Sequence, residues 1–183
     1  MRTSVPENPA IRIVISSRQA VCRLARRRIA KLLVFLLRKS MCSREARGET
    51  VFTLVVTDNR RMPEFKHRCF GIREVTDVIA AAYKPLPGES TEEAELVVNA
   101  ERALDVVTGR FRPGRLAHLS RSGAPGWDLS SEFALYLAHG VDHLSGADDA
   151  TPQDRRRMRQ RELRWLREAG VKGLVNSLLR PSA

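Results

Sequence analysis

Short apolar runs alternate with longer segments of helical periodicity along this chain. Four runs rich in β-branched and aliphatic residues are predicted to be strands, at 11–15, 51–56, 76–79 and 95–99. The second run is apolar almost throughout, which is typical of a strand buried on both faces of a sheet. The alternation of strands with helices predicts one α/β (α+β) domain, in which a mixed sheet of about four strands packs against helices.

The first helical segment, 18–39, combines an apolar face with a basic one. Its apolar positions recur at helical spacing and predict a stripe facing the core: Val21, Leu24, Ile29, Leu32, Leu33 and Leu36. Its other face suits either a solvated surface or contacts to phosphate groups, and holds Arg23, Arg26, Arg27 and Arg28. Shorter helices are expected at 58–71, closed by a glycine, and at 100–107.

Two further helices are predicted in the last third of the chain. The first begins near Ser130 or Ser131, either of which can cap it, and ends at Gly146. The second begins at Thr151-Pro152, with threonine as N-cap and proline at the first helical position, and is expected to end at Gly170. Seven arginines between positions 155 and 167 make this last helix strongly basic.

Composition bounds the partners of the protein. The 183 residues fit a single domain, 1–183 with its core at about 11–170, and the formal net charge of +11 favours an anionic partner, of which nucleic acid is the commonest. Three separated cysteines without a CxxC pair favour reduced thiols, and the apolar run 32–37 is far too short to span a membrane. We therefore expect a cytoplasmic protein with no membrane partner; the sequence leaves its oligomeric state open.

The strongest chemical signal is a pair of histidines one helical turn apart. Residues four apart share a helix face, so His139 and His143 can direct ring nitrogens at one point. Gly146 then lets the chain fold back and bring Asp149 toward them as a third ligand. These three residues predict a metal site with a coordination position left for water.

The segment before this helix, from Thr108 to Trp127, is rich in glycine, proline and arginine. Two interpretations of it are open: a loop that grips a phosphate backbone, or a charged connection with no ligand. The arginines that would contact RNA are Arg110, Arg112, Arg115 and Arg121. Trp127 and Trp165 could stack on bases, although burial in the core is the simpler expectation for each.

At this point the chain resembles the YbeY family of bacterial zinc-dependent endoribonucleases. The family pattern H-G-x-x-H-L-x-G-x-D-H is similar to the segment from His139 to Asp149, which differs at the last position only. The resemblance extends from about 11 to 170 and includes Gly71, Thr76-Asp77-Val78 and Glu95 to Ala103. It implies one zinc ion per chain and a role in ribosomal RNA maturation and small-subunit quality control, with ribosomal RNA and the small ribosomal subunit as partners.

Two departures from the family pattern bear on this implication. The family's third histidine ligand corresponds to Asp149; a carboxylate can bind zinc but also suits iron or manganese, and Asp148 is a competing ligand. An arginine that the family carries before its middle glycine, and that is thought to assist catalysis, corresponds to Phe70. Arg68 or Arg73 would have to substitute for it.

The chemistry expected from these residues is metal-assisted phosphodiester hydrolysis. Asp142 could act beside the metal or accept a proton, or it could simply be a solvated acid. Gly140 follows the first histidine where a zincin protease carries glutamate, so a peptidase is a weaker reading. The principal alternative is a basic RNA-binding or ribosome-binding assembly factor without catalysis, whose metal is structural or absent.

Overall fold

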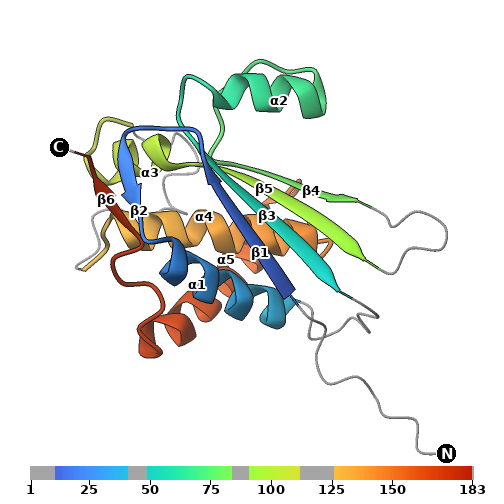
Figure 1. Cartoon of the computed structure of the whole chain (residues 1–183). Coiled ribbons are helices and arrows are strands. Elements are labelled where there is room, and N and C mark those ends of the chain that lie inside the picture. Colours follow the sequence, from blue (N-terminus) through green and yellow to red (C-terminus); the bar gives the residue numbers. More distant parts are fainter. Residues whose placement is uncertain (1–10, 41–48, 84–90, 112–125, 183) are drawn as a thin grey trace, which may run out of the picture.

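The computed structural model describes residues 11–40, 49–83, 91–111 and 126–182, and it has an α/β architecture built on a four-stranded mixed sheet (Figure 1). The strand order is β1-β3-β5-β4, with β1 (Ile11–Ser17), β3 (Thr50–Thr57) and β5 (Glu92–Asn99) parallel to one another. The edge strand β4 (Val78–Tyr83) runs antiparallel to β5. The predicted fold class and sheet are confirmed.

Helices cover both faces of the sheet. The three longest helices pack on one face. Alternate residues of the central strands, such as Leu54 and Leu96, pack into the large core formed with α1 (Arg26–Ser40), α4 (Leu129–Leu144) and α5 (Pro152–Val171). The residues between them point the other way. Those residues form a smaller cluster with α2 (Met62–Phe70): Val55, Met62, Ile79 and Val97. α3 (Ala100–Val107) follows β5 directly, as predicted.

The prediction that one helix runs over 18–39 is wrong at its start. A short strand, β2 (Cys22–Leu24), occupies part of that range, and the helix begins only at Arg26. β2 pairs antiparallel with β6 (Leu179–Pro181), which lies at the other end of the chain. Local periodicity could not reveal this partner, because the pairing is set by a segment more than a hundred residues away.

The helix carrying the two histidines also differs from the prediction at its first residue. Asp128, and neither serine, is the N-cap: its carboxylate accepts the Ser131 N–H at 2.8 Å. Ser130 is buried and its hydroxyl accepts the Leu178 N–H instead. At the other end the prediction is confirmed, since Gly146 adopts a left-handed φ of 91° just after the helix.

The last helix begins as predicted and ends slightly later. The Thr151 hydroxyl accepts the Asp154 N–H at 3.1 Å, which is the expected N-cap. The helix passes through Gly170 and closes at Gly173, whose φ is 66°. Within the described part of the chain, no helix combines the length and the apolar composition that crossing a bilayer requires.

Close packing of α4 on the sheet depends on a glycine. A Cβ at position 140 would lie 2.5 Å from Leu96 Cδ2 and 2.9 Å from Val78 Cγ2, well inside van der Waals contact. Gly140 lies between His139 and Val141 on a helix whose inner face is otherwise fully buried. The missing side chain therefore sets the height of α4 above β4 and β5, and with it the position of the histidine beside the glycine.

We expect Gly140→Ala to lower the free energy of unfolding by about 1–3 kcal/mol, because the added methyl group overpacks the contact between α4 and the sheet. Gly170→Ala is the matched control: nothing lies within 4 Å of a Cβ built there, so helix propensity alone should raise stability by up to about 1 kcal/mol. Urea denaturation of both variants provides the measurement. Equal stabilities of the two variants would contradict this account of the packing.

Candidate metal centre

The two histidines of α4 face each other at the end of the helix. Their Nε2 atoms are 3.1 Å apart, and the ring planes meet at 71°. His139 Nδ1 donates to Glu162 Oε1 at 2.7 Å, and His143 Nδ1 donates to the Ala147 carbonyl at 3.1 Å. Both acceptors can only accept, so both Nδ1 atoms carry hydrogen and both Nε2 atoms of the neutral rings present lone pairs to each other.

Two lone pairs at this distance require a positive charge between them. A shared proton supplies one, and so does a metal ion bound by both nitrogens. Two nitrogens at 2.0–2.1 Å from a tetrahedral zinc would lie about 3.3 Å apart, close to the spacing of the His139 and His143 Nε2 atoms. The Nδ1 partners match the arrangement around metal-binding histidines, which usually donate their second N–H to a carboxylate or a backbone carbonyl.

Asp149 completes a group of three candidate ligands. One nitrogen of each histidine and one carboxylate oxygen of Asp149 all lie within 4.8 Å of one another. The loop that carries Asp149 is held by Arg155, whose guanidinium donates to the Asp149 carbonyl at 2.8 Å. Asp148 is exposed, and its carboxylate accepts the Ala150 N–H. Of the two competing aspartates, the structure therefore brings Asp149 to the histidines.

Glu162 is a residue of the site that the sequence analysis missed. Its side chain is fully buried on α5, where one oxygen binds His139 and the other faces Arg159 Nη1 at 3.2 Å. A signal for it does exist in the sequence, because Glu162 falls on the same helical stripe as Met158, Trp165 and Leu166. An acid in the middle of an apolar stripe needs a buried partner.

Burial and the carboxylate of Glu162 shift the pKa of His139 in opposite directions. Burial by itself lowers the pKa of His139, since it disfavours the charged ring. The hydrogen bond and negative charge of Glu162, with a smaller contribution from Asp77, outweigh burial and the opposing charge of Arg159, so the pKa is raised overall. Glu162 therefore increases the affinity of His139 for a positive charge.

The histidines open onto a cavity of about 420 Å³ between α4 and β4. Phe70, which the resemblance matches to a family arginine, lines this cavity and is 57% exposed. Neither Arg68 nor Arg73 is among the lining residues; the Arg68 guanidinium lies over the Phe65 ring, 4.9 Å from its centre. The wall consists of Phe70, Thr76, Asp77, Val78, Ile79, Ala80, His139, His143 and Asp149.

Asp142 is buried, so the expectation of a solvated acid is wrong. Its side chain has no exposed surface, and both carboxylate oxygens accept from Arg161 Nε, at 2.8 and 3.0 Å. Burial raises the pKa of Asp142, and the hydrogen bonds and charge of Arg161 oppose that shift. Asp142 does not line the cavity, and its contact to α5 gives it a structural task.

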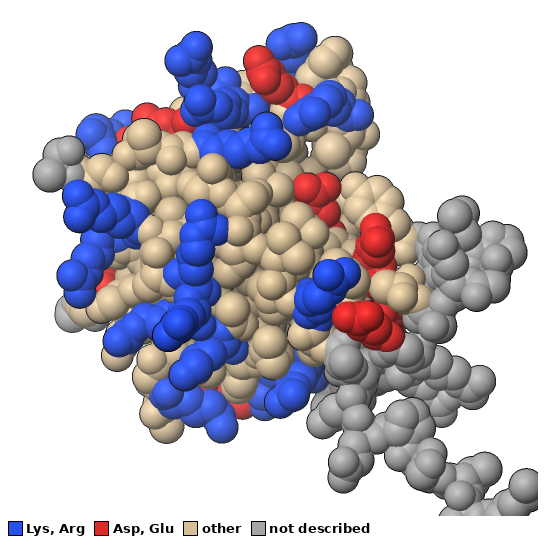
Figure 2. All heavy atoms as spheres, viewed as in Figure 1, with Lys and Arg blue, Asp and Glu red and all other residues tan. Residues whose placement is uncertain are grey.

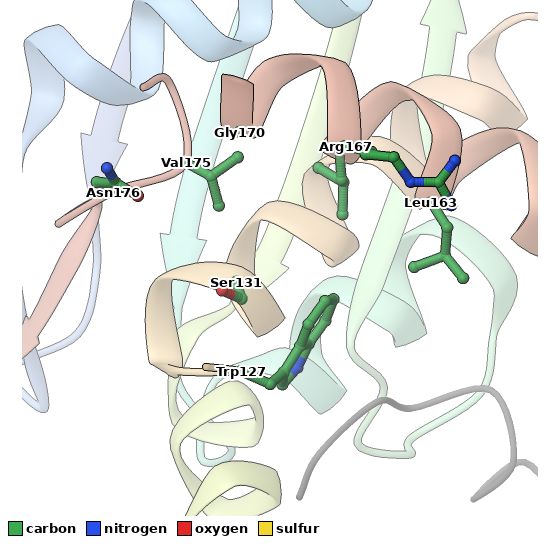
Figure 3. A pocket seen from close by; sticks show the side chains of 8 residues that line it. Trp127, Ser131, Leu163, Arg167, Gly170, Val175 and Asn176 are labelled. Carbon is green, nitrogen blue, oxygen red and sulfur yellow. The ribbon is translucent and has the colours of Figure 1, made fainter. Parts of the chain in front are cut away.

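The remaining candidates lie away from the histidines or outside the described residues. Arg110 pairs with Asp105 at 3.0 Å, whereas Arg112, Arg115 and Arg121 fall in the segment that the structure does not describe. Trp165 is buried, as expected. Trp127 is only half-buried: it lines a second cavity, of about 280 Å³, with Leu163 and Arg167 of α5 (Figure 3), and its indole N–H donates to Glu132.

Comparison with known proteins adds a family to this geometry. No family model matches the sequence. An endoribonuclease YbeY from Anaeromyxobacter sp. is 28% identical over 134 residues, 73% of this chain, but the match spans only 60% of that relative. The endoribonuclease YbeY of Brevibacillus brevis is 28% identical over 78% of this chain and 88% of its own length. That of Chlorobium phaeovibrioides is 41% identical over 36% of this chain and 45% of its own length.

The fold and the site define a basic α/β protein with an accessible cluster of two histidines and an aspartate. Four relatives bear the same name, at 27–41% identity. The shared name and the length of these matches support membership of the YbeY family.

We expect Arg161→Met to destabilise the protein by about 3 kcal/mol, because it leaves the carboxylate of Asp142 buried without its partner. The double variant Asp142→Leu/Arg161→Met should recover most of this loss, since neither charge of this pair then remains between α4 and α5. Chemical denaturation of the two variants and the wild type measures both effects. A double variant as unstable as the single one would show that the pair does more than neutralise Asp142.

Proposed function

We propose that this protein is a metal-dependent endoribonuclease that hydrolyses phosphodiester bonds of single-stranded RNA. The observation that carries the proposal is the pair of Nε2 atoms 3.1 Å apart, each ring fixed through its Nδ1, with Asp149 beside them. The names of the relatives support an RNA substrate. Ribosomal RNA of the small subunit is the substrate we infer, with a role in its maturation and quality control in the cytoplasm.

We infer that His139, His143 and Asp149 hold one zinc ion. Bound zinc would supply Lewis-acid polarisation and stabilise negative charge at the phosphate. Iron or manganese also fits a donor set of two imidazoles and one carboxylate. Glu162 fixes the tautomer and orientation of His139, and Arg159 balances the charge of Glu162.

We propose further roles for residues on the cavity wall and near it. Asp77 is the titratable group on the wall besides the three ligands, and we propose it as the group that holds a proton during hydrolysis. One of its oxygens accepts from the Val78 N–H at 2.9 Å and from the Thr76 hydroxyl, which orients the carboxylate. We propose Arg68 and Arg73 as the phosphate contacts. Both are exposed, and both are close in sequence to Phe70, which lines the cavity.

One observation favours the alternative of a non-catalytic RNA-binding assembly factor. Phe70 stands on the cavity wall where the family arginine is thought to assist catalysis, and an apolar ring cannot stabilise charge on a phosphate. This alternative retains RNA binding, has a structural metal or none, and lacks cleavage. The two functions therefore predict the same affinity for RNA and differ in the rate of RNA cleavage.

Metal analysis of the untagged protein by mass spectrometry should find about one zinc per chain, lost in His139→Ala and in Asp149→Ala because each removes a ligand. Asp148→Ala is the matched control and should retain the metal, since Asp148 lies outside the ligand group. Glu162→Gln keeps a hydrogen-bond acceptor for His139 and removes its charge, so it should weaken zinc binding about 10–100-fold in a competition titration. Loss of zinc in Asp148→Ala with retention in Asp149→Ala would overturn the assignment.

Cleavage of a fluorescent single-stranded RNA should rise about tenfold or more in Phe70→Arg, because an arginine at the cavity wall can stabilise charge on the phosphate. His143→Ala in either background should abolish cleavage while RNA binding stays within a few-fold. Wild-type and Phe70→Arg proteins that bind both zinc and RNA and leave the RNA intact would favour the assembly factor. Equal cleavage by His143→Ala would indicate a contaminating nuclease.

A further inference from the structure

A group of exposed basic side chains lies on the side of the molecule away from the cavity. It comprises residues of β2, the first turns of α1, and β6, and Figure 2 shows Lys and Arg spread over this side with few acidic side chains among them. Hydrogen bonds connect the start of α1 to the segment that leads into β6: the Ala25 N–H donates to the Leu178 carbonyl, and the Arg28 guanidinium donates to the Asn176 carbonyl. We call four of these residues the arginine face: Arg23, Arg27, Lys31 and Arg180.

Two members of the arginine face are direct cross-strand partners. Arg23 of β2 pairs with Arg180 of β6 in the antiparallel register, and both side chains are exposed. Like charges placed directly opposite each other in a sheet are destabilising. The Arg23–Arg180 pair therefore does not stabilise the fold by itself. A bound anion from another molecule would neutralise the repulsion.

The start of α1 shows a second electrostatic conflict. Three consecutive arginines begin the helix, and its first turn contains no acidic residue. Positive charge at a helix N-terminus opposes the macrodipole, and Arg27 lies four residues before Lys31, which adds a like-charge pair on one helix face. Two independent elements thus hold cations together at a cost in stability.

Structural tasks account for the neighbouring arginines and not for the arginine face. Arg26 donates to the Ile15 carbonyl and Arg28 to the Asn176 carbonyl, so both tie α1 to adjacent segments. Among the described residues, no acidic side chain forms an ion pair with any member of the arginine face. These four side chains therefore present their charge to solvent.

The arginine face and the metal cavity lie at opposite edges of the sheet. β1, which leads into β2, is one edge strand, whereas the cavity is lined by residues of β4 at the other edge. Three strand spacings separate the two edges, about 14 Å. A few nucleotides bound in the cavity cannot also cover the arginine face, but a folded RNA extending around the edge of the sheet can.

We propose that the arginine face binds the phosphate backbone of a structured, double-helical part of the RNA whose single-stranded segment enters the metal cavity. This inference rests on RNA as the substrate class proposed above. Exposed arginines without partners recognise backbone charge and carry no base specificity. The RNA is therefore selected by shape, with a duplex next to the cleavage site.

The test compares two double variants that lose the same net charge. Arg23→Gln/Arg27→Gln removes half of the arginine face, and Arg12→Gln/Arg157→Gln removes two exposed arginines elsewhere. Fluorescence anisotropy at about 0.15 M salt measures binding of a hairpin RNA with a single-stranded tail and of the tail alone, and a gel checks that both stay intact. Thermal unfolding and zinc content are recorded for each protein.

We expect Arg23→Gln/Arg27→Gln to bind the hairpin about tenfold more weakly, with a salt slope reduced by about 2. Its affinity for the tail alone, its zinc content and its cleavage of the tail should match those of the wild type, and its melting temperature should be unchanged or higher because repulsion is relieved. Equal weakening by Arg12→Gln/Arg157→Gln would reduce the effect to net charge. Equal weakening of hairpin and tail binding in Arg23→Gln/Arg27→Gln would also overturn the proposal. If this variant bound both RNAs normally but lost binding to an acidic protein, the arginine face would bind protein, and the proposal would again be overturned.

The proposed function fails by a different result. Suppose that neither the wild type nor the variants cleave RNA, and that hairpin affinity falls only in Arg23→Gln/Arg27→Gln. The role of the arginine face is then supported and the nuclease assignment is contradicted. If the tail is cleaved and both double variants bind the hairpin as the wild type does, then the nuclease assignment stands and the arginine face falls. The binding measurement therefore separates the two claims.

Discussion

A seam of buried charge between α4 and α5 is the constraint on which the rest of the structure depends. Glu162 binds His139 and Arg161 binds Asp142, so two neighbouring residues of α5 hold two residues of α4 that are one turn apart. Burying such groups is costly, and a removed partner leaves a charge that the apolar surroundings cannot accommodate. The rotation of the two helices about their axes is therefore fixed, since turning either helix would break both contacts together.

The seam also connects the apolar core to the chemistry of the cavity. Gly140 lowers α4 onto β4 and β5, and His139 is the next residue along the helix. The imidazole thus receives its position from a packing contact on one side and its orientation from a carboxylate on the other. Because the seam is enclosed, the charge of Glu162 acts on the ring with little screening by solvent.

Sequence reasoning reached as far as local patterns extend. Periodicity located the four main strands, and the pairing of His139, His143 and Asp149 followed from helix spacing and a terminating glycine. It missed β2, which is a strand only because distant β6 lies beside it. It also treated Asp142 as solvated, because its counterion, Arg161, lies on another helix and only the packing of α4 against α5 reveals the pair.

The pairing of β2 with β6 has a consequence for how the chain is made. Residues 22–24 emerge from the ribosome early, whereas their partner strand, 179–181, follows nearly the whole of the described chain. The hydrogen bond from Ala25 to Leu178 and the buried Ser130 hydroxyl bound to the Leu178 N–H must wait for the same segment. The start of α1 therefore lacks its contacts to residues 176–179 until that segment has been synthesised, and forming them closes a loop of more than a hundred residues.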